Sequence, residues 1–219
     1  MKGAGRDKNI EISVTGLYSA LGCPRCFWLS QRGLGAPEFP LPGILNRMDR
    51  VTKRFMEKFI GRSDLPPWFP VRGTFLGPTP TLRATYSESG VTLRGRLDAL
   101  VRTADGRYHV VDYKTASPRE EVPEYYQLQL DGYAFLLERN GYSPVASGVL
   151  LHFMPEEGDL TEGRVPFEIT PVRVPVDPSR IPPILYRARR VLEMEAPPPP
   201  DDDCEMCGWR REVGETLGE

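Results

Sequence analysis

Residues 96–114 read RLDALVRTADGRYHVVDYK, which is two runs rich in β-branched and aromatic residues on either side of a polar centre. Such a pattern is typical of a β-hairpin. The centre, Ala-Asp-Gly at 104–106, forms a favourable turn because its glycine can adopt a positive φ. If these three residues are the loop, Thr103 pairs with Arg107, and the register of the whole hairpin is set.

This register places Asp98 directly opposite Asp112. Cross-strand partners have Cβ atoms roughly 4.5–5.5 Å apart on one face of the sheet. Lys114, two residues further along, points to the same face. The opposite face carries side chains that suit a hydrophobic core: Leu93, Leu97, Val101, Val111 and Tyr113. Because facing carboxylates repel each other, the hairpin predicts a cation between the two aspartates.

Two carboxylates and a lysine in this arrangement suit phosphodiester hydrolysis. Mg²⁺ prefers oxygen ligands and often takes one or two protein carboxylates together with waters and phosphate oxygens. Lys114 could orient or deprotonate a water on the ion, or neutralise charge on the phosphate. The alternative is a surface hairpin in which Lys114 forms a salt bridge with Asp98 or Asp112, since Asp-x-Lys alone is a common sequence.

These residues resemble the motif of the PD-(D/E)xK nucleases. Asp98 matches the aspartate of "PD", with Leu97 in place of the proline, and Asp112-Tyr113-Lys114 matches (D/E)xK. The resemblance implies that the two aspartates bind Mg²⁺ or Mn²⁺ and that Tyr113 belongs to the same metal site. It implies that Lys114 supports catalysis. It also implies a restriction-endonuclease-like αβββαβ core, an α/β (α+β) fold whose mixed sheet is flanked by helices.

The helix expected at 123–139 adds a second match. Residues 129–133 read QLDGY, which resembles the Q-x-x-x-Y motif of the RecB-like branch of these nucleases. Gln129 and Tyr133 are four residues apart and therefore share a helix face. The resemblance includes both in the catalytic site, where they could contact the DNA backbone or position Lys114. The alternatives are solvent exposure for Gln129 and core packing for Tyr133.

One feature of the RecB-like pattern is missing. Those nucleases usually carry a histidine metal ligand on an early helix, whereas His109 and His152 of this chain both fall on expected strands. Asp49, on the helix expected at 44–60, is the best substitute oxygen ligand for the metal. An ordinary surface aspartate is the alternative. The missing histidine also leaves open a catalytically inactive domain that binds DNA or a protein partner.

The four cysteines form two Cys-x-x-Cys pairs, Cys23 with Cys26 and Cys204 with Cys207. Four thiolates complete the coordination of a tetrahedral Zn²⁺ ion or of a [4Fe–4S] cluster. Because no cysteine is left over, we expect one shared site; two redox pairs, or one metal knuckle and one accidental pair, are the alternatives. CRISPR-associated RecB-like exonucleases clamp an iron–sulfur cluster between their chain ends. The resemblance therefore favours iron–sulfur, although those proteins have one early and three late cysteines.

The rest of the sequence predicts helices and strands in a single domain, residues 1–219. We expect segments 13–32 and 197–211 to form the clamp around the cysteines, with a stiff polyproline spacer at 197–200. Prolines confine the strand expected at 165–176 to a sheet edge. The expected elements are helices at 13–22, 44–60, 123–139 and 178–194, strands at 81–86, 91–103, 108–114, 145–153 and 165–176, and a loop at 33–43.

Composition excludes several classes of protein. The chain has 219 residues, 40 % of them hydrophobic, and a formal net charge of −2, which argues against a protein that coats nucleic acid nonspecifically. No apolar stretch is long enough to cross a bilayer, and residues 1–8 lead into no secretory signal. We therefore expect no membrane partner and a cytoplasmic location. Basic residues gather at 47–62 and 187–190, where solvated helix faces are the favoured interpretation.

Three functions remain open. The first is a metal-dependent DNA nuclease, an exonuclease or an enzyme that processes ends or single strands, in repair, phage biology or CRISPR spacer acquisition. CRISPR adaptation or repair proteins would then be its partners. The second is an inactive PD-(D/E)xK domain that binds DNA or a protein. The third is an interaction module held together by zinc, in which Asp-x-Lys is a coincidence.

Overall fold

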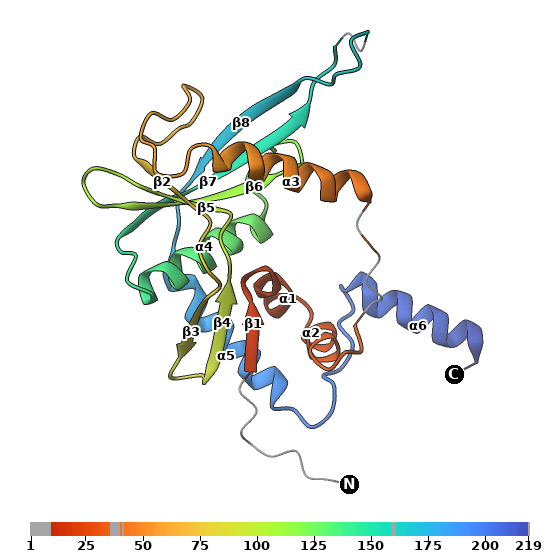
Figure 1. Ribbon diagram of the computed structural model, residues 1–219. Coiled ribbons are helices and arrows are strands. Elements are labelled where there is room, and N and C mark those ends of the chain that lie inside the picture. Colours follow the sequence, from red (N-terminus) through yellow and green to blue (C-terminus); the bar gives the residue numbers. More distant parts are fainter. Residues whose placement is uncertain (1–9, 36–39, 41, 159–160, 219) are drawn as a thin grey trace.

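The computed structural model describes residues 10–35, 40, 42–158 and 161–218 (Figure 1). Its larger sheet has the strand order β2-β5-β6-β7-β8. Strands β6 and β7 are parallel, and the other neighbours in this sheet are antiparallel. The parallel pair requires a crossover between its strands, and helix α4 supplies it. The five strands are β2 (Thr74–Gly77), β5 (Ala99–Arg102), β6 (Tyr108–Lys114), β7 (Val145–Pro155) and β8 (Phe167–Val174).

A smaller sheet of three strands, in the order β1-β4-β3, lies beside the larger one (Figure 1). Strands β1 and β4 are parallel, whereas β3 and β4 form an antiparallel hairpin. The strands are β1 (Ile10–Ser13), β3 (Leu82–Tyr86) and β4 (Val91–Gly95).

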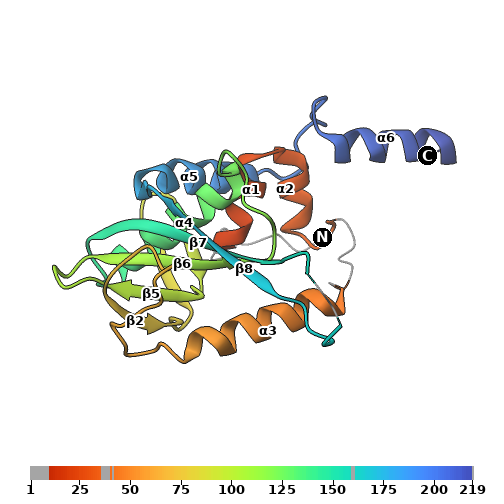
Figure 2. The same cartoon turned by 90° about the horizontal axis from the view of Figure 1, so that it is seen from above.

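Helices cover both faces of the larger sheet. Figure 2 shows α3 on one side and α1, α4 and α5 on the other. Mixed sheets flanked by helices were expected, and the fold class is confirmed. The helices are η1 (Val14–Gly16), α1 (Leu17–Leu21), α2 (Pro24–Ser30), α3 (Gly43–Glu57), α4 (Glu124–Arg139), η2 (Pro178–Arg180), α5 (Ile181–Leu192) and α6 (Glu205–Leu217).

The two faces of the sheet bury separate hydrophobic cores. One core lies on the side of α3 and includes Met56, Phe75, Val101, Val111 and Phe153. The other lies on the side of α4 and also reaches the smaller sheet; it includes Leu93, Leu97, Leu100, Val110, Leu128 and Leu150. Since both faces are covered, a charged side chain on either face is removed from water unless it lies at a strand end.

The prediction of a single strand at 91–103 is wrong, because these residues are divided between the two sheets. Residues up to Gly95 belong to β4, and Ala99 begins β5. A Cβ on Gly95 would lie 2.8 Å from the Val14 side chain and 3.0 Å from Tyr133, so only glycine allows this close approach. The single core face expected for the hairpin is divided too. Leu97 packs in the core beside α4, whereas Val101 packs in the core beside α3.

Most other expected elements are present with shifted ends. The edge position of the strand expected at 165–176 is confirmed by β8, and the interrupted helix expected at 178–194 corresponds to η2 followed by α5. Strands β1 and β2 and helices α2 and α6 were not expected. Parts of the loop expected at 33–43, and the residues 1–8 on which the absence of a secretory signal was argued, lie outside the described residues. Among the helices described here, none is both long and apolar enough to cross a membrane.

A buried charge fixes α4 against the segment that leads into α5. The Asp131 side chain is fully buried and accepts hydrogen bonds from Gln127 Nε2 at 2.9 Å, from the Asp177 backbone N–H at 2.8 Å and from Arg180 Nη1 at 2.9 Å. Burial raises the pKa of Asp131, and these donors oppose that rise. Arg180 also pairs with Glu124, a more exposed partner.

Arg180→Gln should destabilise the fold by about 1–3 kcal/mol, because it leaves the buried Asp131 carboxylate without its cation. The deficit relative to the wild type should shrink as the pH falls, since protonation removes the unpaired charge. Urea unfolding at several pH values measures both effects. Glu124→Gln is the matched control, because it removes only the exposed partner of Arg180 and should change the unfolding free energy by less than about 1 kcal/mol. Equal losses in the two variants would contradict this account.

Candidate functional site

The hairpin has the register that its turn predicts. The Thr103 N–H donates to the Arg107 carbonyl at 2.9 Å, and Ala99 pairs with Val111. Asp98 directly precedes this ladder and Asp112 directly follows Val111, so the two aspartates lie next to the same pair of residues. Asp98 stands just before the first residue of β5, and its Oδ2 accepts a hydrogen bond from the Tyr113 backbone N–H at 3.1 Å.

Asp112 is the more deeply buried of the two carboxylates, with 3 % of the residue exposed. Its Oδ1 accepts a hydrogen bond from Gln129 Nε2 at 2.9 Å, and Lys114 Nζ lies 2.6 Å from its Oδ2. Within the described part of the chain, no donor reaches Oδ2 in good hydrogen-bond geometry. Burial raises the pKa of Asp112 to about 6, against the attraction of Lys114 and with a smaller contribution from Asp98.

Gln129 connects the residues around Asp112. Besides donating to Asp112, its amide accepts a hydrogen bond from Lys114 Nζ at 2.8 Å and lies 3.2 Å from the Tyr133 hydroxyl. The Tyr133 side chain is buried in the core that contains residues of α4, and its hydroxyl also contacts Gln129. Tyr133 therefore has both of the roles considered for it, core packing and a contact with Gln129. Lys114 also lies over the ring of Tyr126, 3.9 Å from its centroid, a cation–π contact. One amide thus fixes both the carboxylate and the ammonium.

Helix α3 approaches the site through a residue that the sequence analysis missed. Lys53 Nζ lies 3.3 Å from Asp98 Oδ1 and 2.7 Å from Asp49 Oδ1. Burial acts to lower the pKa of Lys53, but the carboxylates of Asp49 and Asp98 outweigh burial, and the pKa is raised. Asp49 therefore reaches Asp98 through a bridging ammonium. The available signal was the i, i+4 spacing of Asp49 and Lys53 on a helix expected near the hairpin.

A pocket of about 250 Å³ opens beside Asp98, on the side of α3. It is lined by Lys53, Glu57, Ile60, Phe75, Pro78, Arg96, Leu97, Asp98 and Tyr113. The ring of Tyr113 packs edge-on against Phe153, and burial raises its pKa, so the phenol stays neutral. Tyr113 thus contacts Asp98 through its backbone N–H, and its side chain belongs to the pocket wall.

The two histidines make contacts elsewhere. His109 Nδ1 lies 2.8 Å from Ser147 Oγ, and burial lowers the pKa of this histidine. His152 pairs in register with Lys114 on the neighbouring strand, but its Nδ1 binds the Ala116 carbonyl. Neither histidine contacts Asp98 or Asp112 through any of these bonds.

The carboxylate pair fits a hard divalent cation. Asp98 accepts from the backbone N–H of Tyr113, the residue after Asp112, and each carboxylate is paired with a lysine of this chain, Lys53 or Lys114. Asp112 Oδ2 is buried without a well-directed donor, which is the situation that a cation relieves. Asp98 lines the pocket, and a set of oxygen donors alone is what Mg²⁺ or Mn²⁺ takes.

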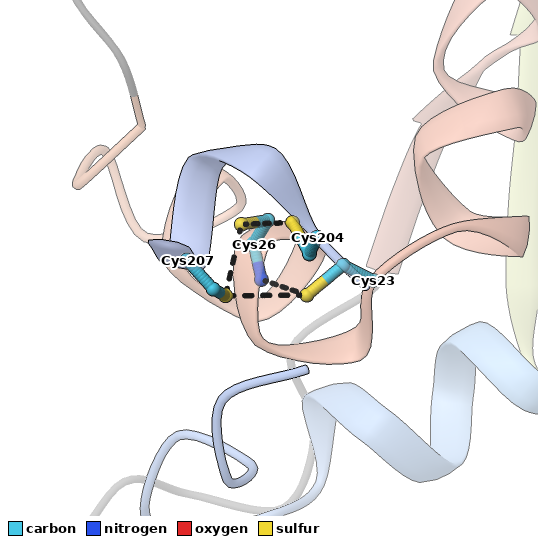
Figure 3. Close-up of side chains that lie close together, drawn as sticks. All are labelled: Cys23, Cys26, Cys204 and Cys207. Atoms are coloured by element: carbon cyan, nitrogen blue, oxygen red, sulfur yellow. Dashed lines mark hydrogen bonds between the residues drawn. The ribbon is translucent and has the colours of Figure 1, made fainter. Parts of the chain in front are cut away.

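The four cysteines converge on a second site (Figure 3). Cys23 and Cys204 are the N-cap residues directly before α2 and α6, and Cys26 and Cys207 lie in the first turn of those helices. All four sulfurs lie within 4.8 Å of one another. The shared site that joins the two ends of the chain is therefore confirmed, and two separate redox pairs or a single knuckle are excluded.

Contacts that do not involve the cysteines also fasten the C-terminal segment to α2. Trp28 Nε1 donates to the Met194 carbonyl at 3.0 Å, and Arg25 Nη1 donates to the Pro198 carbonyl at 2.9 Å. Beyond this segment, α6 extends away from the body of the protein (Figures 1 and 2). The cysteine site is thus the principal anchor of α6.

Comparison with known families shows the superfamily of the chain. The sequence model of the PD-(D/E)XK nuclease superfamily matches residues 30–211, and the chain belongs to that superfamily. The match includes the hairpin with Asp98 and Asp112, helix α4 and the second cysteine pair. No curated protein sequence matches the chain.

The chain is similar to several solved structures at low sequence identity, and one of them, with a TM-score of 0.55, shows the fold. A candidate exonuclease from Eubacterium rectale is 12 % identical with a TM-score of 0.55, over 93 % of this chain and 89 % of that one. An alkaline exonuclease from Laribacter hongkongensis is 12 % identical with a TM-score of 0.45, over 94 % of each chain. A protein named SSO0001 is 18 % identical with a TM-score of 0.44, over 89 % of this chain and 81 % of that one.

Removing the metal from the cysteine site should release α6 and leave the sheet folded. Cys204→Ser, or a chelator, breaks the anchor, whereas the contacts of Trp28 and Arg25 remain. An isolated helix of this length is marginal in water, so α6 should lose its protection against hydrogen exchange. Hydrogen exchange by mass spectrometry measures this for residues 205–217 and for β6. Glu205→Gln, an exposed change between the cysteines, is the control, and simultaneous loss of protection in β6 would contradict a local anchor.

Proposed function

We propose that this protein is a Mg²⁺- or Mn²⁺-dependent DNA nuclease of the RecB-like branch that hydrolyses phosphodiester bonds. The observation that carries the proposal is the grouping of Asp98, Asp112, Lys114 and Gln129 at one end of the hairpin. Membership of a nuclease superfamily implies a hydrolase with DNA as its substrate. The contact between Gln129 and Tyr133 supports the RecB-like branch, because it joins the two motif residues to Asp112 and Lys114.

The chemistry divides between the ion and the side chains. When bound, the divalent ion would supply positive charge at the phosphate and an acidified water as nucleophile. Asp98 and Asp112 would hold the ion. Lys114 lies within ion-pair distance of Asp112, so its ammonium can stabilise the negative charge that develops on the phosphate. Gln129 holds Lys114 and Asp112 in one geometry, which keeps the lysine directed toward the reacting centre.

Lys53 has a part in this proposal as well. Its ammonium now neutralises Asp98, so an incoming divalent ion must displace it. After displacement, Lys53 remains at the wall of the pocket together with Arg96, where both cations can bind the phosphates of a strand. Asp49 is then the partner that holds Lys53 near the site, and a direct ligand role for Asp49 requires that the lysine move away.

The kind of substrate follows from the resemblance in motifs. Similarity to CRISPR-associated RecB-like exonucleases extends the proposal to DNA ends or single strands, processed in spacer acquisition or repair. Proteins of CRISPR adaptation or of repair would be the partners. The exonucleases among the solved structures with this fold are in keeping with an exonuclease.

Asp112→Asn should reduce Mn²⁺-dependent cleavage of labelled single- and double-stranded DNA below detection, because the ion loses a fixed carboxylate ligand. Lys114→Ala should lower the cleavage rate about 10²–10³-fold, the range for loss of one group that stabilises developing negative charge. Mn²⁺ binding, followed by calorimetry, should survive in Lys114→Ala and fail in Asp112→Asn. Gln129→Ala should cost less activity than either change.

Two substitutions control for folding and charge. Asp105→Asn lies in the turn of the same hairpin, and Lys58→Ala lies one residue beyond α3; both should cleave like the wild type. If Asp112→Asn and Lys114→Ala also cleave like the wild type, the assigned site is wrong. A wild type that binds DNA in Ca²⁺ and cleaves none in Mn²⁺ would instead establish the inactive DNA-binding domain. No DNA binding at all would favour the interaction module.

A further inference from the structure

The separations between the cysteine sulfurs measure the size of the group that they can hold. Cys23 Sγ lies 3.6 Å from Cys207 Sγ, and Cys26 Sγ lies 3.7 Å from Cys204 Sγ and 3.8 Å from Cys207 Sγ. None of the four is in a disulfide. Figure 3 shows the four side chains directed toward a common centre.

These separations fit one tetrahedral ion. A regular tetrahedron with edges of about 3.7 Å has its centre about 2.3 Å from every corner, and about 2.3 Å is the zinc–thiolate bond length. These three separations are therefore those expected between the ligands of a single bound ion, and the remaining sulfur pairs lie within 4.8 Å.

The same separations do not fit a [4Fe–4S] cluster. In such a cluster each thiolate binds its own iron, and four irons and four sulfides occupy the middle. If every sulfur pair were at the 4.8 Å limit, the centre would lie about 2.9 Å from each sulfur. Subtracting a metal–thiolate bond of about 2.3 Å leaves roughly 0.6 Å between each iron and the centre. Four irons cannot occupy that space, so the sulfurs would have to move apart to admit the cluster.

The two cysteine pairs occupy the same place in their helices. Cys23 and Cys204 are the N-cap residues of α2 and α6, and Cys26 and Cys207 lie in the first turn of each helix. At α2, the Cys26 N–H also donates to Cys23 Sγ at 3.5 Å. The two pairs thus supply two sulfurs each to one closed site.

A nearby arginine supplies positive charge beside the cysteine site. An ion of charge +2 with four thiolates leaves a net charge of −2 near the surface. Arg210, one turn beyond Cys207 on α6, places Nη1 3.9 Å from Cys26 Sγ, and its Nη2 donates to the Leu34 carbonyl at 3.3 Å. Its guanidinium therefore offsets part of that charge and ties α6 to the segment after α2.

We infer that the four cysteines bind one tetrahedral Zn²⁺ ion and not the iron–sulfur cluster that the resemblance suggests. Four thiolates at this spacing select zinc or a single iron, and zinc is the common occupant of closed, structural Cys₄ sites. The inference concerns the clamp between the chain ends and does not depend on nuclease activity.

The test is the metal content of full-length protein that is purified anaerobically from cells grown with added iron and zinc. We expect about one zinc per chain, no acid-labile sulfide and no visible colour. X-ray absorption at the zinc edge should show one shell of sulfur at about 2.3 Å and no neighbouring metal. Co²⁺ substitution should give the intense visible bands of a tetrahedral tetrathiolate ion. Anaerobic handling matters, because it prevents an oxygen-sensitive cluster from being lost and replaced.

Cys207→Ser should lose most of the bound zinc, whereas Glu205→Gln, an exposed change between the same cysteines, should keep it. Four irons with four labile sulfides per chain would overturn the inference. One iron per chain without sulfide would overturn the choice of zinc. If Cys207→Ser cannot be purified in folded form, Arg210→Gln provides the second variant, and it should retain the zinc with weaker affinity. Undiminished zinc in Cys207→Ser would place the ion elsewhere and overturn the inference.

Discussion

The repulsion between two neighbouring carboxylates is the constraint on which the site depends. Asp98 and Asp112 are brought together by the hairpin register, and burial denies Asp112 the water that would stabilise its charge. Each carboxylate is paired with one ammonium group, Asp98 with Lys53 and Asp112 with Lys114. Each carboxylate is thereby neutralised within the folded chain. Lys53 is the more exposed of the two ammonium groups, so a divalent cation can compete with it for Asp98.

The position of the site follows from the break between the two sheets. Because β4 ends at Gly95 and β5 begins at Ala99, the intervening residues leave one sheet and enter the other. Asp98 stands at this crossing, next to the pocket beside α3, while Asp112 faces α4 and receives Gln129 from it. The carboxylate pair thus joins two helical layers that share no hydrophobic core. A continuous strand would have carried Asp98 into the sheet, with no pocket beside it.

The sequence predicts what depends on local rules, and it fails where distant segments meet. The turn at 104–106 sets the hairpin register, in which Ala99 pairs with Val111, and the adjacent aspartates are thereby brought near each other. The spacing of Gln129 and Tyr133 on a helix predicts their contact equally well. By contrast, the break at Gly95 arises from close approach of Val14 and Tyr133, which no local pattern encodes. Lys53 was read as part of a solvated face, because its partnership with Asp98 depends on how α3 packs across the sheet.

The two candidate metal sites use opposite donor chemistry, and this difference keeps their ions apart. Carboxylate oxygens select hard ions such as Mg²⁺, whereas four thiolates select softer ions such as Zn²⁺. The sites differ in closure too. Four cysteines complete a tetrahedron and leave no position for a substrate, whereas Asp98 lines an open pocket in which water and phosphate could complete the coordination of an ion. In the proposed nuclease, a permanent ion would therefore hold α6 in place while an exchangeable ion would enter and leave with the substrate.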